Sequence, residues 1–233
     1  MSHAPPEFSG FPPALFDFLA ELSANNERDW FEKNKARYEE YVRGPALAFV
    51  RAMAPHLAAV TPHLIGDDRK MGGSLMRIYR DTRFSADKTP YKTNVGIQFR
   101  HGAGKDVHGP GLYLHLDLEE TFVGVGMWRP EKDALAAIRQ RIADEPDRWR
   151  GITEDPVFAA TFRQGGESLK RVPRGFDKDH PLVEELKRTS FILMHDLPPE
   201  AAESAELPHT LGTLLNTAAP YCRFLCQAIG LPF

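Results

Sequence analysis

Positive charge is concentrated between Arg69 and Arg100. This stretch holds eight basic and two acidic residues, a local charge of +6 in a chain of 233 residues whose total charge is −3. Guanidinium groups bind carboxylate or phosphate through paired hydrogen bonds, and lysine adds a point charge. We therefore expect the stretch to bind a small anionic ligand, and phosphorylated ligands belong to that class. The predicted ligand-binding cations are Arg77, Arg80, Arg83, Lys88 and Lys92.

Two acidic residues lie within this basic stretch, and they leave two interpretations open. In the first, Asp81 and Asp87 orient the cations around a ligand, and Asp87 is a candidate catalytic base. In the second, Asp81 pairs with Arg80 and Asp87 pairs with Lys88, so that the ion pairs lock a loop and bind nothing. Ion-pair networks and true sites both perturb pKa values, so composition alone does not separate the two interpretations.

A second group of polar residues alternates along one predicted strand. Tyr113, His115 and Asp117 share one side of it, and the next strand carries Gly124 and Gly126. Glycines on a strand face let a ligand or another backbone approach closely. We expect Tyr113 to contact a ligand and His115 to be a second candidate proton carrier. A His-x-Asp pair can also ligate a metal, but no third ligand is evident, so we predict no metal site.

The surroundings of this strand face decide whether it is a site. If the strand that carries Arg77 joins the same sheet, Arg77 lies beside Gln98 and the face becomes a polar, partly basic groove with aromatic walls at Tyr79 and Trp128. The alternative is a second helix layer that covers the face, with the glycines admitting bulky side chains. Both alternatives are open at this point.

The positioning element is a sheet predicted over about residues 75–128. Period-two alternation is clearest from Leu112 to Glu119, where Leu112, Leu114, Leu116 and Leu118 share the apolar side. A short turn at Glu119 and Glu120 then predicts an antiparallel hairpin. The other predicted strands are Leu75–Arg80, Val95–Phe99, Thr121–Trp128 and one further strand near residues 190–195.

Helical patterns flank the predicted sheet on both sides along the chain. Apolar residues recur at the helical period within residues 12–61 and again over about 130–230, with a long loop predicted from Gly165 to Pro181. Helices first, an antiparallel sheet in the middle and helices last indicate an α+β fold. We expect residues 1–233 to form one α+β domain.

Four segments of the chain resemble a known family. They are FSGF at 8–11, NNERDWFEKNKARYEEYV at 25–42, RIYRDTRFSADKTPYKTN at 77–94, and the GLYLHL and VGVGMWRP motifs within 111–130. The chain resembles an uncharacterised group of bacterial and fungal proteins known as a conserved domain of unknown function. The resemblance implies membership, and it assigns the 77–94 motif as the family's defining feature. Because no reaction is established for the family, the resemblance assigns no catalytic residue.

Several classes of protein are excluded by what the sequence contains. The near-balanced charge gives no whole-molecule field for nucleic acid or anionic membrane, so any such partner would need a local patch. No leader segment and no apolar run of about 18 residues is present, so we expect a cytoplasmic protein with no membrane partner. Cys222 and Cys226 lie four residues apart on a predicted helix and are expected to be buried thiols. The common nucleotide-binding, zinc-protease and serine-hydrolase motifs are absent.

Three functions remain open from sequence. The first is binding of a small anion by the basic stretch and the polar strand face; if the protein is an enzyme, the cations would stabilise charge, with Asp87 or His115 carrying a proton. The second, less favoured, is nucleic-acid binding, with Tyr79, Phe84 and Tyr91 stacking on bases. The third is an interaction module whose motif is purely structural. The sequence does not decide whether a reaction is catalysed, and it names no cofactor.

Overall fold

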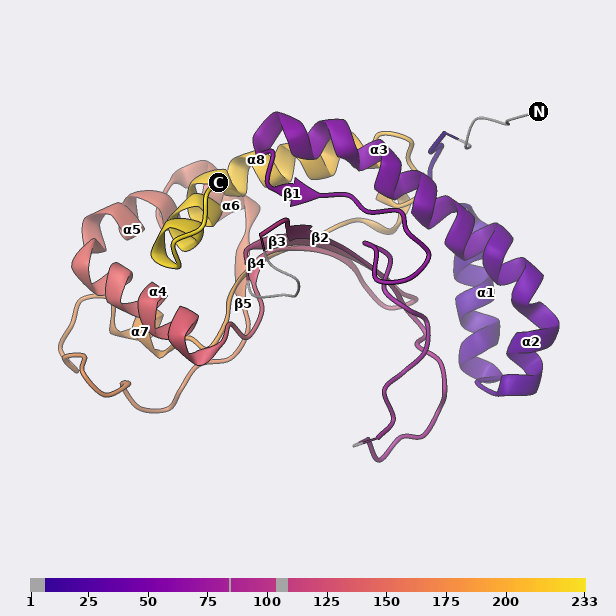
Figure 1. The fold of residues 1–233 in the computed structure, drawn as a ribbon, viewed down its shortest axis with the longest axis horizontal. Coiled ribbons are helices and arrows are strands. Elements are labelled where there is room, and N and C mark those ends of the chain that lie inside the picture. The colour runs from indigo at the N-terminus through magenta and orange to yellow at the C-terminus, as the bar shows by residue number, and fades with distance from the viewer. Residues whose placement is uncertain (1–6, 84, 104–108) are drawn as a thin grey trace.

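The fold is α+β, as predicted, and is built on one antiparallel sheet of six strands (Figure 1). The computed structural model describes residues 7–83, 85–103 and 109–233. The strands lie in the order β1-β2-β3-β4-β6-β5. Their bounds are β1 (Leu64–Ile65), β2 (Val95–His101), β3 (Gly111–Leu116), β4 (Thr121–Met127), β5 (Arg163–Gly165) and β6 (Phe191–Asp196).

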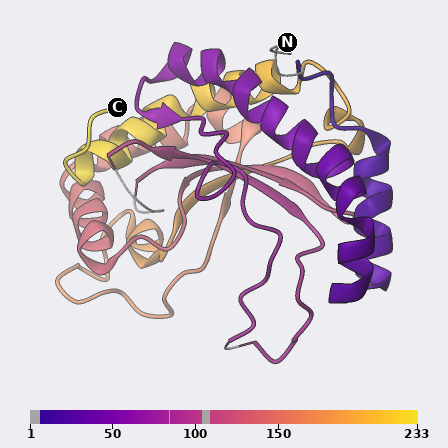
Figure 2. The ribbon, with the colours of Figure 1, turned by 45° about the vertical axis from the view of Figure 1, so that its right-hand side comes forward.

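The helices cover one face of an arched sheet and leave the concave face open in its centre (Figures 1 and 2). Helices α3 and α8 lie across the convex face, α1 and α2 stand at one end, and α4, α5 and α7 stand at the other. A π-helical segment, Tyr38–Arg43, joins α2 to α3. The α-helices are α1 (Pro13–Ala24), α2 (Arg28–Arg37), α3 (Gly44–Val60), α4 (Lys132–Asp144), α5 (Pro146–Thr153), α6 (Pro156–Thr161), α7 (Val183–Lys187) and α8 (Leu207–Ala228).

The core lies between the convex face and α3 and α8. The alternation predicted for the three central strands is confirmed, because each strand turns one set of side chains toward these helices. Full burial of an aliphatic side chain stabilises the fold by about 1.5–3 kcal/mol, so these strands anchor the sheet. The buried set is Val95, Ile97, Phe99, Leu112, Leu114, Leu116, Val123, Val125 and Met127.

Leu118 was expected on the buried face, and this prediction is wrong. Strand β3 ends at Leu116, and Leu118 lies in the following turn with 49% of its surface exposed. The cause is the Asp117 carboxylate, whose Oδ1 accepts the backbone N–H groups of Glu119 at 2.8 Å and Glu120 at 2.7 Å. An aspartate that binds the backbone two and three residues ahead favours a turn over continued strand.

The predicted strand Leu75–Arg80 forms only isolated bridges with its neighbours and no continuous strand. Leu75 pairs with Ile97 beside β2, but Tyr79 pairs with Tyr91, so the register shifts by two residues between the two bridges. The shift bends the chain away from the sheet, as a bulge does. Residues 77–83 and 85–93 thus form the two limbs of a projecting segment, here called the arm, which Figure 2 shows extending from the concave side.

Helix α8 packs against α3 and β4 and runs through the core. It contains Cys222 and Cys226, which are both buried and unbonded, as predicted. Of the helices that the structure describes, none has the length and apolar character needed to cross a lipid bilayer.

Candidate functional site

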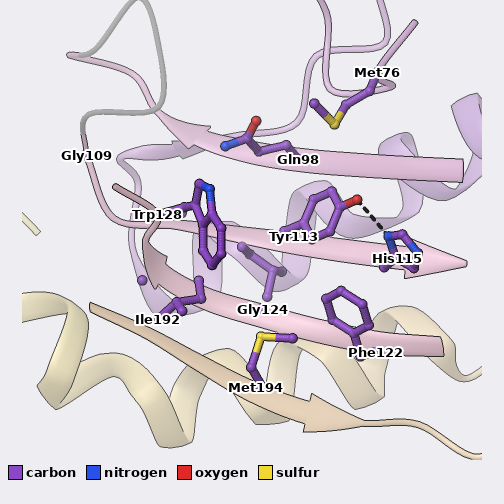
Figure 3. Close-up of a pocket in the computed structure, with 13 residues that line it drawn as sticks. Met76, Gln98, Gly109, Tyr113, His115, Phe122, Gly124, Trp128, Ile192 and Met194 are labelled. Atoms are coloured by element: carbon purple, nitrogen blue, oxygen red, sulfur yellow. Dashed lines mark hydrogen bonds between the residues drawn. The ribbon is translucent and has the colours of Figure 1, made fainter. Parts of the chain in front are cut away.

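A pocket of about 390 Å³ opens on the concave face of the sheet (Figure 3). Its floor comes from the middle of the sheet, with Tyr113 of β3, Gly124 of β4 and Ile192 of β6. Met76, Phe122 and Trp128 contribute apolar side chains around this floor, and Trp128 is 50% exposed. Of the two alternatives left open by the sequence, the structure shows the pocket: no helix of the described residues lies over this part of the face.

Two glycines line the pocket for different reasons. A Cβ atom built on Gly124 would lie 3.5 Å from Ile192 Cδ1, an ordinary contact, so packing of the protein does not require glycine there. Gly126 has φ +123°, and a Cβ atom on it would lie 2.1 Å from the carbonyl oxygen of Phe191. Gly126 is thus required by the backbone, whereas Gly124 leaves room above the floor.

The polar end of the pocket is a chain of hydrogen bonds along one strand face. Tyr113 Oη lies 2.9 Å from His115 Nδ1, and His115 Nε2 lies 2.9 Å from Asp117 Oδ2. Since the Asp117 carboxylate only accepts, Nε2 carries the hydrogen and Tyr113 donates to Nδ1. Asn94 Nδ2 is 3.4 Å from Nδ1, and the Phe122 ring stacks on the imidazole with centroids 4.6 Å apart. These contacts fix the imidazole ring in one orientation.

The charges in this chain follow from its surroundings. Burial, together with the negative charges of Asp117 and Glu120, raises the pKa of Tyr113 to about 12, so the phenol stays protonated at neutral pH. Burial alone would raise the pKa of Asp117. The backbone N–H groups of Glu120 and Glu119 and the hydrogen bond from His115 outweigh it and lower that pKa below its usual value.

This arrangement has a defined chemical capacity. A hydroxyl, an imidazole and an oriented carboxylate in a hydrogen-bonded row can pass a proton, because the carboxylate stabilises the charged imidazole. Tyr113 can also bind an oxygen or nitrogen atom of a molecule that occupies the pocket. Two residues predicted from the sequence, Tyr113 and His115, are therefore brought together at one end of the pocket.

The cations of the arm are placed elsewhere. None of the five predicted cations is among the residues that line the concave pocket. Arg80 Nη1 binds the Asp87 carboxylate and donates to Thr89 Oγ1 at 2.6 Å, and Arg83 Nη2 lies 2.6 Å from Asp81 Oδ2. These partners differ from the pairs considered from sequence, because the arm's two limbs bring Asp87 back to Arg80.

Asp87, the other candidate proton carrier, is held ionised. The backbone N–H of Thr89, the Arg80 guanidinium and the Thr89 hydroxyl lower the pKa of Asp87 to about 2. General bases work best with a pKa near the working pH, so this carboxylate is a weak base. Its contacts are those of a residue that holds the arm's shape.

The remaining cations of the arm differ from one another. Lys88 Nζ donates to the carbonyl oxygen of Thr82 at 2.8 Å. Lys92 is half-buried, and burial followed by the charge of Arg77 lowers the pKa of Lys92. Among the described residues, no carboxylate forms an ion pair with Lys92. Arg77 and Lys92 thus place two positive charges near each other at the base of the arm.

The aromatic residues considered for base stacking are not equally available. Tyr91 is 2% exposed, and its ring stacks on Phe31 with centroids 4.2 Å apart, so it faces the protein and not a ligand. Tyr79 is 48% exposed. Phe84 lies outside the described residues.

Several lining residues were not predicted. Gln98, Tyr113, His115 and Trp128 were expected on this face and line the pocket. Arg77 and Tyr79 were expected beside them and do not line it, since the arm bends away. Met76, Ile192 and Met194 were missed. Only the further strand expected near 190–195 pointed to the last two, and that expectation did not say which strand they would join.

Comparison with known families identifies the chain's relatives. Residues 14–224 match the sequence profile of the conserved hypothetical protein family DUF2461, so the chain belongs to that family. The match covers most of the chain and confirms the resemblance seen in the sequence. Neither the curated proteins nor the solved structures gave a match.

Proposed function

We propose that this member of the DUF2461 family binds a small organic molecule in the concave pocket, with an apolar body on the floor and an oxygen-bearing end at Tyr113. The observation that carries the proposal is a mostly apolar pocket that ends in the Tyr113–His115–Asp117 hydrogen-bond chain. Pockets for small molecules commonly enclose about 300–1,000 Å³ and combine apolar walls with a few placed polar groups.

The shape of the pocket supports a flat or slender ligand. Gly124 keeps the floor low between Tyr113 and Ile192, and Trp128 offers an aromatic face at its edge. Apolar contact then supplies most of the binding free energy, at about 25 cal/mol for each Å² removed from water. Tyr113 supplies orientation, because its phenol is neutral and can exchange hydrogen bonds between His115 and a ligand.

The test is a thermal-shift screen with benzoate, indole-3-acetate, octanoate and their amides, followed by calorimetry on the best compound. Binding of at least one compound is expected, since a ligand that binds only the native state raises the melting temperature. Gly124→Leu should abolish binding by filling the floor, and Tyr113→Phe should weaken it about tenfold through one lost hydrogen bond.

The control for these variants is Gly151→Leu. An added Cβ atom at Gly151, in α5, meets nothing within 4 Å, so this variant changes a glycine without touching the pocket. Its affinity should equal that of the unsubstituted protein. Binding that survives Gly124→Leu would place the compound outside the pocket, and silence across the whole panel would contradict this class of ligand.

A second candidate function is small-anion binding at the base of the arm. Lys92 favours it, because a half-buried ammonium group beside Arg77, with no carboxylate partner among the described residues, leaves positive charge that an anion can neutralise. Phosphate and pyrophosphate are the probes. Lys92→Met should remove the stabilising effect of these anions. Lys88→Met should keep it, because the Lys88 ammonium group already donates to the carbonyl oxygen of Thr82.

The same experiment separates nucleic acid from a small anion. A short single-stranded oligonucleotide that binds more tightly than pyrophosphate, with affinity falling steeply between 50 and 200 mM salt, would favour a nucleic-acid partner. Equal effects of Lys92→Met and Lys88→Met would argue against a site at Lys92.

A further inference from the structure

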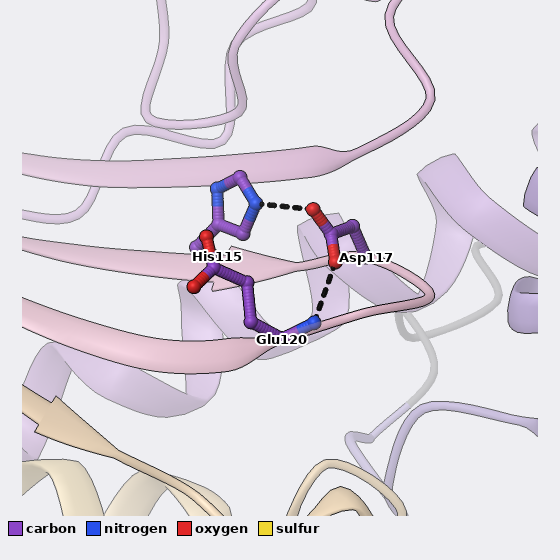
Figure 4. A group of neighbouring side chains, drawn as sticks. All are labelled: His115, Asp117 and Glu120. Atoms are coloured by element: carbon purple, nitrogen blue, oxygen red, sulfur yellow. Dashed lines mark hydrogen bonds and ion pairs between the residues drawn. The ribbon is translucent and has the colours of Figure 1, made fainter.

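Three potential metal ligands meet at the β3–β4 turn, beside the polar end of the pocket (Figure 4). One ligand atom each from His115, Asp117 and Glu120 lies within 4.8 Å of the others. We propose that these three side chains bind a divalent transition-metal ion of the Zn²⁺ or Mn²⁺ type. The proposal goes beyond ligand binding in the pocket and does not depend on it.

The turn itself positions two of the three ligands. The backbone N–H of Asp117 donates to the carbonyl oxygen of Glu120 at 3.1 Å, which closes the turn and places Glu120 next to Asp117. Asp117 Oδ1 accepts from the backbone of Glu119 and Glu120, so its other oxygen, Oδ2, faces His115. A carboxylate already held by backbone hydrogen bonds loses little freedom when it binds an ion.

The distance between His115 and Asp117 fits a shared ion. His115 Nε2 and Asp117 Oδ2 are 2.9 Å apart. Two ligands that each lie about 2.1 Å from one ion are separated by about 3.0 Å at the right angle of an octahedral site and by about 3.4 Å at the tetrahedral angle of Zn²⁺. At this separation the ion lies to one side of the line between the two atoms, so the imidazole and the carboxylate turn toward it while their separation changes little.

The proton that the ion displaces has a destination. When Nε2 becomes a ligand, the neutral imidazole carries its hydrogen on Nδ1. Tyr113 Oη, 2.9 Å away, then accepts a hydrogen bond from this N–H. Metal-binding histidines usually donate their second N–H to such a partner, which fixes the ring. The Tyr113 hydroxyl hydrogen is then directed away from His115. No net proton is released from the imidazole in this exchange.

Glu120 supplies the third ligand, and its side chain can rotate toward the ion. Its side chain is exposed, and within the described chain its carboxylate forms no hydrogen bond or ion pair. Rotation of this side chain can close the remaining distance to an ion. Glu120 and Asp117 together supply two negative charges for a dication. Glu120 is also the third ligand that the sequence analysis did not find for the His-x-Asp pair.

The ligand set selects among metals. One imidazole nitrogen and two carboxylate oxygens suit Zn²⁺ and Mn²⁺, whereas Ca²⁺ prefers six to eight oxygen ligands and Mg²⁺ a near-ideal octahedron of oxygens. Three protein ligands also leave at least one coordination position for water or for a group on a pocket-bound molecule. The site is thus of the open kind.

The test is calorimetric titration of the chelator-treated full-length protein with Zn²⁺, Mn²⁺, Mg²⁺ and Ca²⁺. One equivalent of Zn²⁺ or Mn²⁺ should bind at least about tenfold more tightly than Mg²⁺ or Ca²⁺. Glu120→Gln should weaken binding about tenfold or more, and Asp117→Asn should do the same while its side-chain oxygen still caps the turn. Glu119→Gln, one residue away in the same turn, is the matched control and should bind like the unsubstituted protein.

Each other outcome has a meaning. Equal affinity in Glu120→Gln and Glu119→Gln, or binding that persists in His115→Gln, would show an adventitious ion only and overturn the proposal. Circular dichroism melts of each variant confirm folding, and the exposed Glu120 variant should fold normally. Gly124→Leu should keep the metal, so failure of the metal site and failure of the ligand pocket are distinguishable.

Discussion

The side-chain amide of Asn26 pairs with both backbone groups of Tyr91. Asn26 Nδ2 donates to the carbonyl oxygen of Tyr91 at 3.0 Å, and Asn26 Oδ1 accepts the N–H of Tyr91 at 3.0 Å. The pairing joins the turn between α1 and α2 to the returning limb of the arm, where the Tyr91 ring also stacks on Phe31. One asparagine side chain therefore holds the base of the arm, through the same pair of N–H and C=O hydrogen bonds that a neighbouring strand would make with Tyr91.

Replacement of this asparagine should loosen the arm. Asn26→Asp keeps the acceptor but puts a carboxylate oxygen against the Tyr91 carbonyl, so one hydrogen bond is lost and a repulsion is gained. We expect a loss of about 1–3 kcal/mol in the free energy of unfolding. Urea denaturation measures the loss, and faster hydrogen exchange at the Tyr91 amide locates it. An unchanged exchange rate there would show that the pairing does not hold the arm.

The two pocket glycines should respond differently to alanine. Gly126→Ala forces a Cβ atom onto the Phe191 carbonyl at a positive φ, and we expect a loss of at least about 2 kcal/mol. Gly124→Ala makes only ordinary contacts and should leave stability within about 0.5 kcal/mol. Thermal denaturation of the pair, side by side, checks the contrast. Equal losses would mean that Gly124 too is required by the backbone.

Acid should release the contact between Asp87 and Arg80 that joins the two limbs of the arm. The pKa of Asp87 is lowered to about 2 from its usual 3.8, so ionised Asp87 favours the ordered arm above its usual pKa. This stabilisation is lost as the pH falls from about 4 to about 2. The chemical shift of the Thr89 amide, followed by NMR, should titrate near pH 2, and Asp87→Asn should abolish that transition. A midpoint near 3.8 would indicate that the contacts with Arg80 and Thr89 are not formed in solution.

The two thiols should be inert in the folded protein. Burial raises the pKa of Cys226 to about 12, and burial together with the neighbouring Cys226 raises the pKa of Cys222 as well. The thiolate is the reactive form, so a disulfide reagent at pH 8 should modify neither residue until the chain unfolds. In denaturant both should react at once. Rapid modification of the native protein would show that α8 opens to solvent.

One substitution should stabilise the protein. Gly151 lies within α5, and an added Cβ atom would meet nothing within 4 Å. Alanine loses less backbone entropy than glycine in a helix, so Gly151→Ala should raise the free energy of unfolding by about 0.5–1 kcal/mol. Urea denaturation is the measurement. A decrease would mean that this short helix needs the freedom of glycine at that position.

The sheet was predictable wherever its strands alternate over enough residues. Strands β2, β3 and β4 have six or seven residues each, and their buried and open faces follow from period two. Strands β1 and β5, with two and three residues, are too short to show a period, and neither was predicted. Ile192 and Met194 of the pocket's lining come from β6, whose pairing with β4 no local pattern specifies.

The basic arm shows a different limit of sequence reasoning. Composition identified the cations, but their partners depend on how the two limbs are paired. Arg80 reaches Asp87 across the arm, and Arg83 reaches back to Asp81. A shift of one residue between the limbs would break the Arg80–Asp87 pair, whereas Arg83 and Asp81 lie two residues apart in the same limb. The density of charge in the sequence does not distinguish Arg80 and Arg83, which form ion pairs, from Lys92, which has no carboxylate partner among the described residues.

Strand β4 has one neighbour close in the sequence and one far away. It follows β3 after a short turn, but β6 begins at Phe191, long after β4 ends at Met127. During synthesis, β2, β3 and β4 can therefore pair as a meander while one edge of β4 is still open, and open edges invite association between chains. Only when the last third of the polypeptide has emerged does β6 close that edge and complete the floor on which Gly124 lies. Chains cut short before β6 should associate with one another instead of binding a ligand.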